Sequence, residues 1–393
     1  MRTHTYLTGA LMARTGDEAA GPALLLAGFA VAGSTAGASV PLAGLSLSAA
    51  LGGPVLGALL DRAARPGRLL AGALVLYAGG LTLVLAGLGR LPLAVVVATA
   101  LVTGLAGPAL SGGWSAQLPA VAPEGRLSRA NALDTMTFGA AALAGPVLAG
   151  GAAEALGAPT AVVLAATIVA AAAPAAWALP ARARTSGTSR AVLGTLAAGT
   201  RAVLRNRSLA RATRTSVVSC VAQGMLTACV PLLGERVLGG AGRGAALLSC
   251  AAVSALAANA LLARFPPPLT PDALVRAGAL VQALAPALAL TGRPALLVAA
   301  FLVSGLGEGP QLTALFAVRH REAPERLRGQ VFTTGASLKI TGFALGAAAA
   351  GPLAAWSLAA ALTAATATAL LAVGRGNPAA RVPLPARPGR REA

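Results

Sequence analysis

The chain alternates long apolar segments with short polar ones. Each apolar segment is close to the ~20 residues that a helix needs to cross a bilayer. None shows the residue-by-residue alternation of an outer-membrane β-barrel. The pattern therefore predicts an all-α membrane protein with twelve transmembrane helices, at residues 7–32, 39–60, 69–89, 92–114, 130–151, 159–180, 209–233, 243–264, 272–290, 294–317, 329–351 and 355–374.

One longer polar stretch divides these segments into two groups of six. We predict an N-terminal six-helix bundle at 1–180, a cytoplasmic basic linker at 181–208, a C-terminal six-helix bundle at 209–374 and a cytoplasmic tail at 375–393. Within the linker, aliphatic residues from Val192 to Leu204 alternate with arginines. This alternation fits either a short helix lying on the inner leaflet or a solvated basic connection.

The two groups carry matching short motifs about 200 residues apart, at equivalent helix ends. Such matches indicate a duplicated six-helix unit, the pseudo-symmetric architecture of many secondary transporters. The paired motifs are Leu59-Leu60-Asp61-Arg62 with Leu261-Leu262-Ala263-Arg264, Pro123-Glu124-Gly125-Arg126-Leu127 with Pro324-Glu325-Arg326-Leu327, and Gly145-Pro146 with Gly351-Pro352.

Composition supports the membrane assignment. Of the 393 residues, 56% are apolar and only 11% are charged, whereas about a quarter are charged in an ordinary soluble domain. The three cysteines lie within apolar segments, which excludes a disulfide-stabilised scaffold.

The formal charge of +19 would suggest nucleic-acid binding in a soluble protein, but here it follows the predicted topology. With both termini on one side, 25 basic residues fall in the loops and tails of that side and four in those of the other. The positive-inside rule then places both termini in the cytoplasm. Only Lys339 is lysine among the 31 basic residues, which suggests a GC-rich bacterial gene and the bacterial cytoplasmic membrane. We expect no nucleic-acid partner.

The stretch from Gly57 to Arg68 places a carboxylate, Asp61, at a membrane boundary beside Arg62, Arg65 and Arg68. It resembles the signature loop between helices 2 and 3 of the major facilitator superfamily. The resemblance implies that Asp61 acts as a conformational latch, contacting the N-terminal end of the helix that begins near Gly329 when the inner side is closed. The alternative is a positive-inside loop with an incidental Asp.

Further motifs resemble the macrolide-exporter-like branch of that superfamily, which implies drug or metabolite export. Helix 5 carries a Gly-Pro antiporter-like motif, Gly145-Pro146 followed by Gly150-Gly151, with three residues between the proline and the glycine pair where the family pattern has two. The segment at 94–114 lacks the intramembrane arginine of typical drug/proton antiporters. The other resembling stretches are Arg14-Thr15-Gly16-Asp17, Leu118-Pro119 with Arg129-Ala130-Asn131-Ala132-Leu133, and Leu327-Arg328-Gly329-Gln330-Val331.

Three ionisable residues fall near the centre of predicted helices. At a rise of about 1.5 Å per residue, Asp17, Glu308 and Lys339 lie roughly 15 Å deep in a ~30 Å core. Such charges are costly and are functional candidates by default. We expect Asp17 or Glu308 to carry the coupling proton and Lys339 to tune it, and the alternative is a static buried ion pair. The glycines around Glu308, followed by Pro310, favour the first interpretation.

Weaker candidates for the cavity lining are Asp134, Gln223, Thr227 and Gln311, for which interhelical hydrogen bonding is the main alternative. Glu18 follows Asp17 about 100° further around its helix, where it could face another partner.

The sequence contains no phosphate-binding Gly-x4-Gly-Lys loop, no metal-ligand constellation and no nucleophile elbow, so we expect no enzyme, no metal and no cofactor. We predict a secondary transporter that exports a small organic molecule by proton-coupled alternating access, acting as a monomer in the lipid bilayer. Its partners are the substrate and protons. Uptake or facilitated diffusion of a metabolite is the alternative, and a membrane adaptor or membrane-embedded enzyme is a more distant one.

Overall fold

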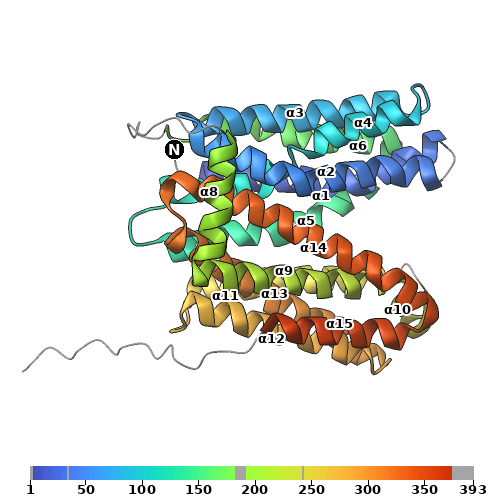
Figure 1. The fold of residues 1–393 in the computed structure, drawn as a ribbon. Helices are drawn as coiled ribbons and strands as arrows, with labels where there is room; N and C mark the ends of the chain where they lie inside the picture. The colour runs from blue at the N-terminus through green and yellow to red at the C-terminus, as the bar shows by residue number, and fades with distance from the viewer. Residues whose placement is uncertain (1–2, 33–34, 182–191, 241–242, 374–393) are drawn as a thin grey trace, which may run out of the picture.

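The computed structural model describes residues 3–32, 35–181, 192–240 and 243–373, and within these ranges it contains helices and no strand (Figure 1). The tail predicted at 375–393 and residues 182–191 of the linker lie outside the described residues. Two groups of helices lie one above the other in Figure 1, and α8 (Val192–Arg205) crosses one end of both. We call α1 to α7 the N half and α9 to α15 the C half.

The N half is formed by α1 (Thr3–Ala32), α2 (Thr35–Arg62), α3 (Pro66–Gly87), α4 (Leu93–Gly104), the π turn η1 (Ala109–Gly113), the 3-10 turn η2 (Leu118–Ala120), α5 (Leu127–Leu156), α6 (Ala158–Ala171) and α7 (Ala173–Trp177). The C half is formed by α9 (Arg207–Ala228), α10 (Val230–Leu238), α11 (Gly244–Arg264), α12 (Pro271–Ala289), α13 (Pro294–Glu322), the 3-10 turn η4 (Glu325–Leu327), α14 (Arg328–Trp356) and α15 (Leu358–Val373).

The helices account for all twelve predicted segments. In the described part of the chain, nine spans are long and apolar enough to cross a membrane, and α9 with α10, bent by 45°, supplies a tenth. The remaining two predicted segments are α1, which carries three charged residues, and the 16-residue α15. Breaks within predicted segments fall beside prolines, as at Pro174 and Pro231, because proline cannot continue the backbone hydrogen-bond ladder.

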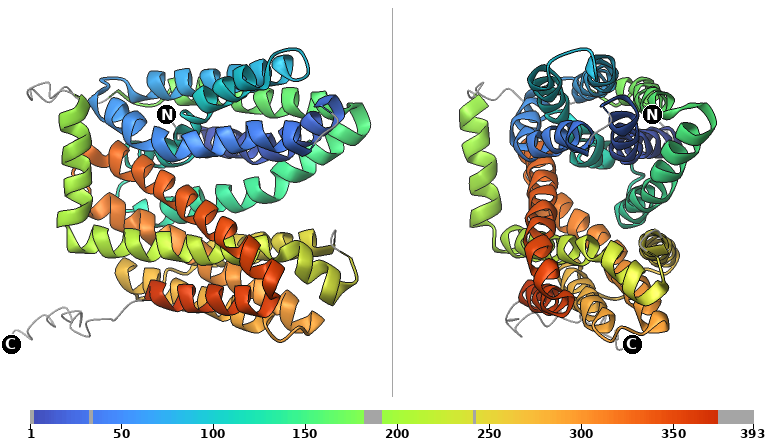
Figure 2. Two further views of the ribbon diagram at one scale, coloured as in Figure 1. Left: turned by 45° about the vertical axis from the view of Figure 1, so that its right-hand side comes forward. Right: turned by 90° about the vertical axis from the view of Figure 1, so that its right-hand side faces the viewer.

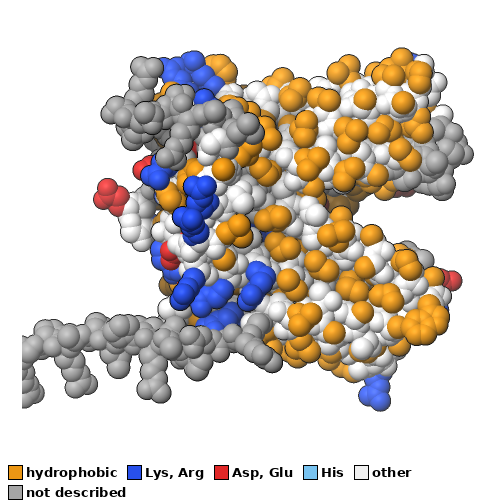
Figure 3. Space-filling model, in the orientation of Figure 1, with side chains coloured by type: hydrophobic (Ala, Val, Ile, Leu, Met, Phe, Trp, Pro, Cys, Tyr) orange, Lys and Arg blue, Asp and Glu red, His pale blue; other side chains and the backbone are white. Residues whose placement is uncertain are grey.

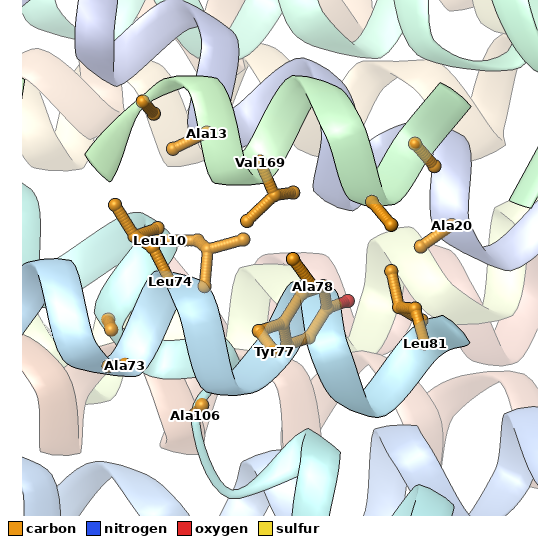
Figure 4. Close-up of a cluster of buried hydrophobic side chains, with 14 of the residues drawn as sticks. Ala13, Ala20, Ala73, Leu74, Tyr77, Ala78, Leu81, Ala106, Leu110 and Val169 are labelled. Carbon is orange, nitrogen blue, oxygen red and sulfur yellow. The ribbon is translucent and has the colours of Figure 1, made fainter. Parts of the chain in front are cut away.

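Small residues let the helices of the N half approach closely. Leu74 and Tyr77 of α3 pack with Ala13 of α1 and Val169 of α6 in a continuous buried cluster (Figure 4). A Cβ at Gly16 would meet the side chain of Val169, so α1 and α6 touch where glycine leaves room. Helix pairs in membranes associate through such close packing, because the lipid offers no hydrophobic driving force.

The halves meet along α2 with α14 and along α5 with α11. In Figures 1 and 2, α14 runs obliquely out of the C half and lies against α2 at the α8 end of the molecule. A Cβ at Gly53 or Gly57 of α2 would clash with the backbone of α14 at Thr333 or Gln330. These glycines therefore allow α2 and α14 to approach closely.

The linker contains a helix, α8, which lies roughly perpendicular to the membrane-spanning helices (Figure 1). Its Leu196 carbonyl accepts a hydrogen bond of 2.9 Å from Nε2 of Gln330 at the start of α14. Asn206 then caps α9, because its side-chain oxygen accepts from the backbone N–H groups of Ser208 and Leu209.

Candidate functional site

The halves are joined at the α8 end by a carboxylate of one half and a helix N-terminus of the other. Asp61, at the end of α2, accepts hydrogen bonds of 2.7 Å from the backbone N–H groups of Gly329 and Gln330 in the first turn of α14. The unpaired N–H groups and dipole of a helix N-terminus favour a carboxylate there. This is the contact with Gly329 that the family resemblance implied.

The arginines of the same loop lie toward solvent. Arg62, Arg65 and Arg68 are all exposed, and Arg68 stacks over the ring of Trp177 at 4.9 Å to the centroid. All three arginines of the motif are therefore accessible to solvent.

Further polar contacts between the halves lie farther from the α8 end than the Asp61 contact. The Ser337 hydroxyl on α14 donates to the Ala49 carbonyl of α2 at 2.7 Å and accepts from the Gly53 N–H at 3.1 Å. Thr135 of α5 bonds Thr313 of α13 at 2.5 Å. The contacts of both helix pairs hold the halves together at this depth.

Three phenylalanines from the two halves pack together toward the α8 end, and we call them the aromatic seal. Phe316 of α13 lies 6.0 Å from Phe138 of α5 and 5.2 Å from Phe332 of α14, measured between ring centroids. These spacings are those of attractive aromatic pairs.

On the side away from α8 the surface is hollowed between the halves (Figure 3). We call this hollow the central cavity. The molecule is therefore sealed at one end and open at the other.

Glu308 and Lys339, predicted at mid-membrane depth, both lie half-buried in the C half. The Glu308 carboxylate accepts a 2.7 Å hydrogen bond from Nε2 of Gln223 on α9. Glu308 and Lys339 form no ion pair within the described part of the chain, so in this conformation the static pair considered above is absent.

Asp17 forms its hydrogen bond with a residue of the N half. Its carboxylate accepts a 2.6 Å hydrogen bond from the hydroxyl of Tyr77, a buried residue of α3. The next residue, Glu18, is exposed, and the charges of both Asp17 and Glu308 act on it. Glu18 also borders Gly145 of α5, where an added Cβ would meet the Glu18 Cβ. Glu18 therefore lies near α5 and is close enough to Glu308 for the two charges to interact.

The orientation of α1 explains this arrangement. Glu18 follows Arg14 by four residues, so the two share one face of α1. Arg14 reaches α5, and that face of α1 therefore points toward α5 rather than toward α3.

Asp134 is not part of the cavity wall in this conformation, which corrects its prediction as a lining residue. It is 0% exposed and forms an ion pair of 3.0 Å with Nη1 of Arg14. Ser115 donates to its other oxygen at 2.6 Å, and the Tyr6 hydroxyl donates at 3.1 Å. Arg14 also donates to Ser115, to the Asp134 carbonyl and to Thr137. This buried network joins α1, α5 and the end of the α4 segment.

Of the other lining candidates, Gln223 contacts Glu308 as described, and Thr227 is half-buried on the same helix. Gln311 is buried and bonds Gln282 and Ser219, each at 3.0 Å. It therefore makes interhelical hydrogen bonds, the alternative that the sequence left open. A small cavity inside the C half is lined by Ser219, Gln223, Gln282 and Ser304, among others.

The helix 5 motif divides into two parts. Gly145 packs against α1, and Pro146 follows it within α5. A Cβ at Gly150 or Gly151 would meet no atom within 4 Å, so this glycine pair contacts no described neighbour in this conformation.

Sequence reasoning missed one buried charge, because Arg319 was assigned to an inner loop. The helix continues to Glu322, well past the end predicted at 317, and Arg319 is 2% exposed. Its guanidinium lies 5.9 Å from the ring of Phe316 and 5.5 Å from that of Phe332. The neighbouring His320 is also buried, with its ring 4.5 Å from that of Phe332.

No group of three or more His, Cys, Asp or Glu residues in the described ranges is arranged to hold a metal ion. Between the two ends lie single titratable groups from both halves, of which Asp17, Glu308 and Lys339 are half-buried. Such groups can exchange protons or bind a charged ligand.

Residues 6–333 match the Major Facilitator Superfamily. No curated protein sequence matches the chain significantly. The fold is similar to that of the human organic anion transporter MFSD10 (TM-score 0.76, 18% identity, covering 94% of this chain and 97% of that one). It is also similar to a bacterial homologue of the iron transporter ferroportin in an outward-facing state (TM-score 0.76, 15% identity, 95% and 98%) and to FucP in the outward conformation (TM-score 0.72, 14% identity, 94% and 96%).

Proposed function

The chain belongs to the Major Facilitator Superfamily, and we propose that this multi-pass transporter exports a small organic molecule, a drug or secondary metabolite, by proton-coupled alternating access. The observation that carries the proposal is the difference between the two ends of the molecule. The halves are joined by Asp61 and the aromatic seal at the α8 end and are separated by the central cavity at the other. This is the geometry of one end state of alternating access.

The orientation proposed from the sequence makes this state outward-open. Arginine side chains gather around α8 and the start of α9 (Figure 3), and Arg201, Arg205 and Arg207 are exposed there. By the positive-inside rule the α8 end, the linker and both termini are cytoplasmic. Reporter fusions test this: a reporter after Arg184 or Arg390 is expected to read cytoplasmic and one after Gly240 external. An external signal after Arg184 would contradict the orientation.

Asp61 is proposed as the latch that keeps the cytoplasmic side shut. To open that side, the carboxylate must leave the two N–H groups of α14. The glycines at positions 53 and 57 allow α2 and α14 to close tightly again.

The proposed energy source is the proton gradient, since the sequence has no ATP-binding loop of the Walker type. One charge moved across 100 mV supplies ~2.3 kcal/mol, enough for roughly fortyfold accumulation. Glu308 and Asp17 are the proposed proton carriers, with Lys339 tuning the site. The position of Glu18 adds it as a third candidate.

The test uses proteoliposomes with an imposed pH gradient and a substrate found by comparing metabolites inside and outside cells with and without the protein. Glu308→Gln, Asp17→Asn and Glu18→Gln are compared with Glu154→Gln, which alters an exposed carboxylate near the end of α5. The variant of the carrier is expected to exchange substrate down its gradient and to lose uphill movement. Uphill movement that persists in the triple variant would exclude these carboxylates.

Uptake or facilitated diffusion is the second candidate, because α4 lacks the intramembrane arginine of typical antiporters and similar folds include fucose and xylose proton symporters. Indifference of the wild type to the pH gradient would favour facilitated diffusion. Gradient-driven movement into the cytoplasm would favour uptake.

A further inference from the structure

Arg319 is a buried cation whose hydrogen-bonding capacity is left unused. Two of its guanidinium nitrogens, Nε and Nη2, are enclosed by protein and have no hydrogen-bond partner. A guanidinium carries five N–H donors and remains charged in proteins, so it cannot escape this cost by losing its proton. A buried donor without an acceptor calls for an explanation, such as a ligand absent from the structure.

The surroundings of Arg319 attract a cation without satisfying its donors. The rings of Phe316 and Phe332 lie within the ~6 Å at which a cation–π attraction operates. Neither ring provides an oxygen acceptor. None of the described carboxylates forms an ion pair with Arg319.

A second cation, Lys339, lies on the helix that Arg319 packs against. A Cβ at Gly335 of α14 would meet the guanidinium of Arg319 directly, so the group lies against that face of α14. Lys339 is four residues further on and therefore occupies the same face, one turn closer to the open end. The charges of Lys339, Glu308 and Arg319 all act on Cys220 of α9, so the Glu308 carboxylate belongs to the same region as the two cations.

We propose that Arg319 and Lys339 form a binding site for an oxyanion group, such as a carboxylate, carried by an otherwise apolar organic substrate. The planar guanidinium can bind an oxyanion through two parallel hydrogen bonds, and the ammonium adds a point charge. Phe316 and Phe332 would contact the apolar part next to that group. The inference rests on the proposed function, because it names the substrate class of that transporter.

The depth of the site suits loading from the α8 end. Arg319 is only three residues from the end of α13 and lies against the aromatic seal. When the seal parts, Arg319 is the first of the central charges to meet the solution on that side, and an anion entering there reaches it before Lys339.

The test is equilibrium binding to the purified full-length protein in lipid nanodiscs, without any gradient. The probes are pairs with the same apolar body and opposite charge: phenylbutyrate with phenylbutylamine, and naphthoate with naphthylmethylamine. The wild type is expected to bind the carboxylates at least about tenfold more tightly than the amines. Preference for the amines, or failure of both carboxylates to bind, would overturn the proposal.

Variants then locate the site. Arg319→Gln and Lys339→Gln are expected to lose the preference for carboxylates, while Arg319→Lys keeps part of it. Gly335→Ala keeps every charge but displaces the guanidinium, so it provides a second measurement if Arg319→Gln fails to fold. Arg321→Gln is the matched control, since Arg321 is exposed and already paired with Asp272 and Glu322. Unchanged carboxylate affinity in both Arg319→Gln and Gly335→Ala would overturn the assignment.

These experiments distinguish an error in the proposed binding site from an error in the proposed proton coupling. Carboxylate binding without gradient-driven movement would contradict proton coupling and leave the site intact. Gradient-driven movement of a substrate that carries no anionic group would contradict the site and leave the proposed function intact.

Discussion

Two arginines, one in each half, are equally buried and have opposite surroundings. Arg14 and Arg319 are both 2% exposed, and both stack against phenylalanines of the aromatic seal, Arg14 at 3.7 Å from the centroid of Phe138. Arg14 has a carboxylate, a carbonyl and hydroxyls as acceptors, and only its Nε is enclosed without a partner, whereas Nε and Nη2 of Arg319 are both enclosed without one. Burial alone therefore does not separate a structural charge from a functional one, but the count of acceptors does.

The contrast has an energetic basis. Removing one member of a buried ion pair leaves an uncompensated charge, while replacing a whole pair with apolar residues is often tolerated. A buried charge that has no partner already carries the cost of its lost hydration. The same substitution should therefore have opposite effects at the two arginines.

The largest effect is expected for Arg14→Met, which leaves the Asp134 carboxylate buried without its cation. We expect a loss of about 3 kcal/mol in the free energy of unfolding, measured by denaturation in detergent. The double variant Arg14→Met/Asp134→Leu should recover most of that loss. A double variant as unstable as the single one would show that the network stabilises through its hydrogen bonds rather than its charges.

Asp61→Asn tests a charge that is bonded across the two halves, whereas the Arg14–Asp134 pair lies within the N half. It removes the charge from two hydrogen bonds to the start of α14, so we expect the sealed conformation to lose about 2 kcal/mol, roughly a thirtyfold shift in the equilibrium. Distances between spin labels on α2 and α14 at the α8 end should then broaden or lengthen, and transport should fall. Glu124→Gln, an exposed loop carboxylate, serves as control. If the Asp61→Asn variant keeps the label distances and the transport rate of the wild type, Asp61 is only part of a positive-inside loop and not a latch.

Arg319→Met is the counterpart of the first prediction. Because Arg319 has no acceptor to leave behind, we expect unfolding stability to stay the same or rise by about 1 kcal/mol. Binding of anionic probes should be lost in the same variant. A destabilisation as large as that of Arg14→Met would place Arg319 in an unrecognised structural network and remove the contrast.

The smallest effect is expected for Tyr77→Phe, which deletes one hydroxyl that donates to Asp17. Interhelical hydrogen bonds in membranes contribute about 0.6 kcal/mol on average, and we expect a loss of that size in thermal unfolding. Uphill transport should change more than stability if Asp17 is the proton carrier. Unchanged coupling would direct attention to Glu18 and Glu308.

The sequence predicted the helices well because burial in a bilayer demands long apolar runs, and the motif at Asp61 predicted a contact 268 residues away. The prediction of helix ends was wrong where the last turns of a helix are polar. Arg319 was placed in a loop because hydropathy falls before the hydrogen-bond ladder ends. Asp134 was placed near the cavity because a depth along one helix does not reveal which neighbour its face meets.

For the same reason the sequence left open which way Asp17 and Glu18 face. Adjacent helical positions point about 100° apart, so the orientation of α1 decides which carboxylate reaches the cavity. That orientation is set by the tertiary contacts of Arg14 with α5 and of Gly16 with α6. A helix considered alone does not contain them.

The crossing helix α8 has a mechanical consequence. It lies against α2, α14 and α9, so it touches both halves at the end that opens in the proposed mechanism. Fourteen residues at about 1.5 Å each make a rod of roughly 21 Å. The bond between Gln330 and Leu196 ties this rod to α14 of the C half, and its contact with the N half is made by α2. A helix does not stretch, so if the halves part at this end, α8 must either slide over α2 or leave it.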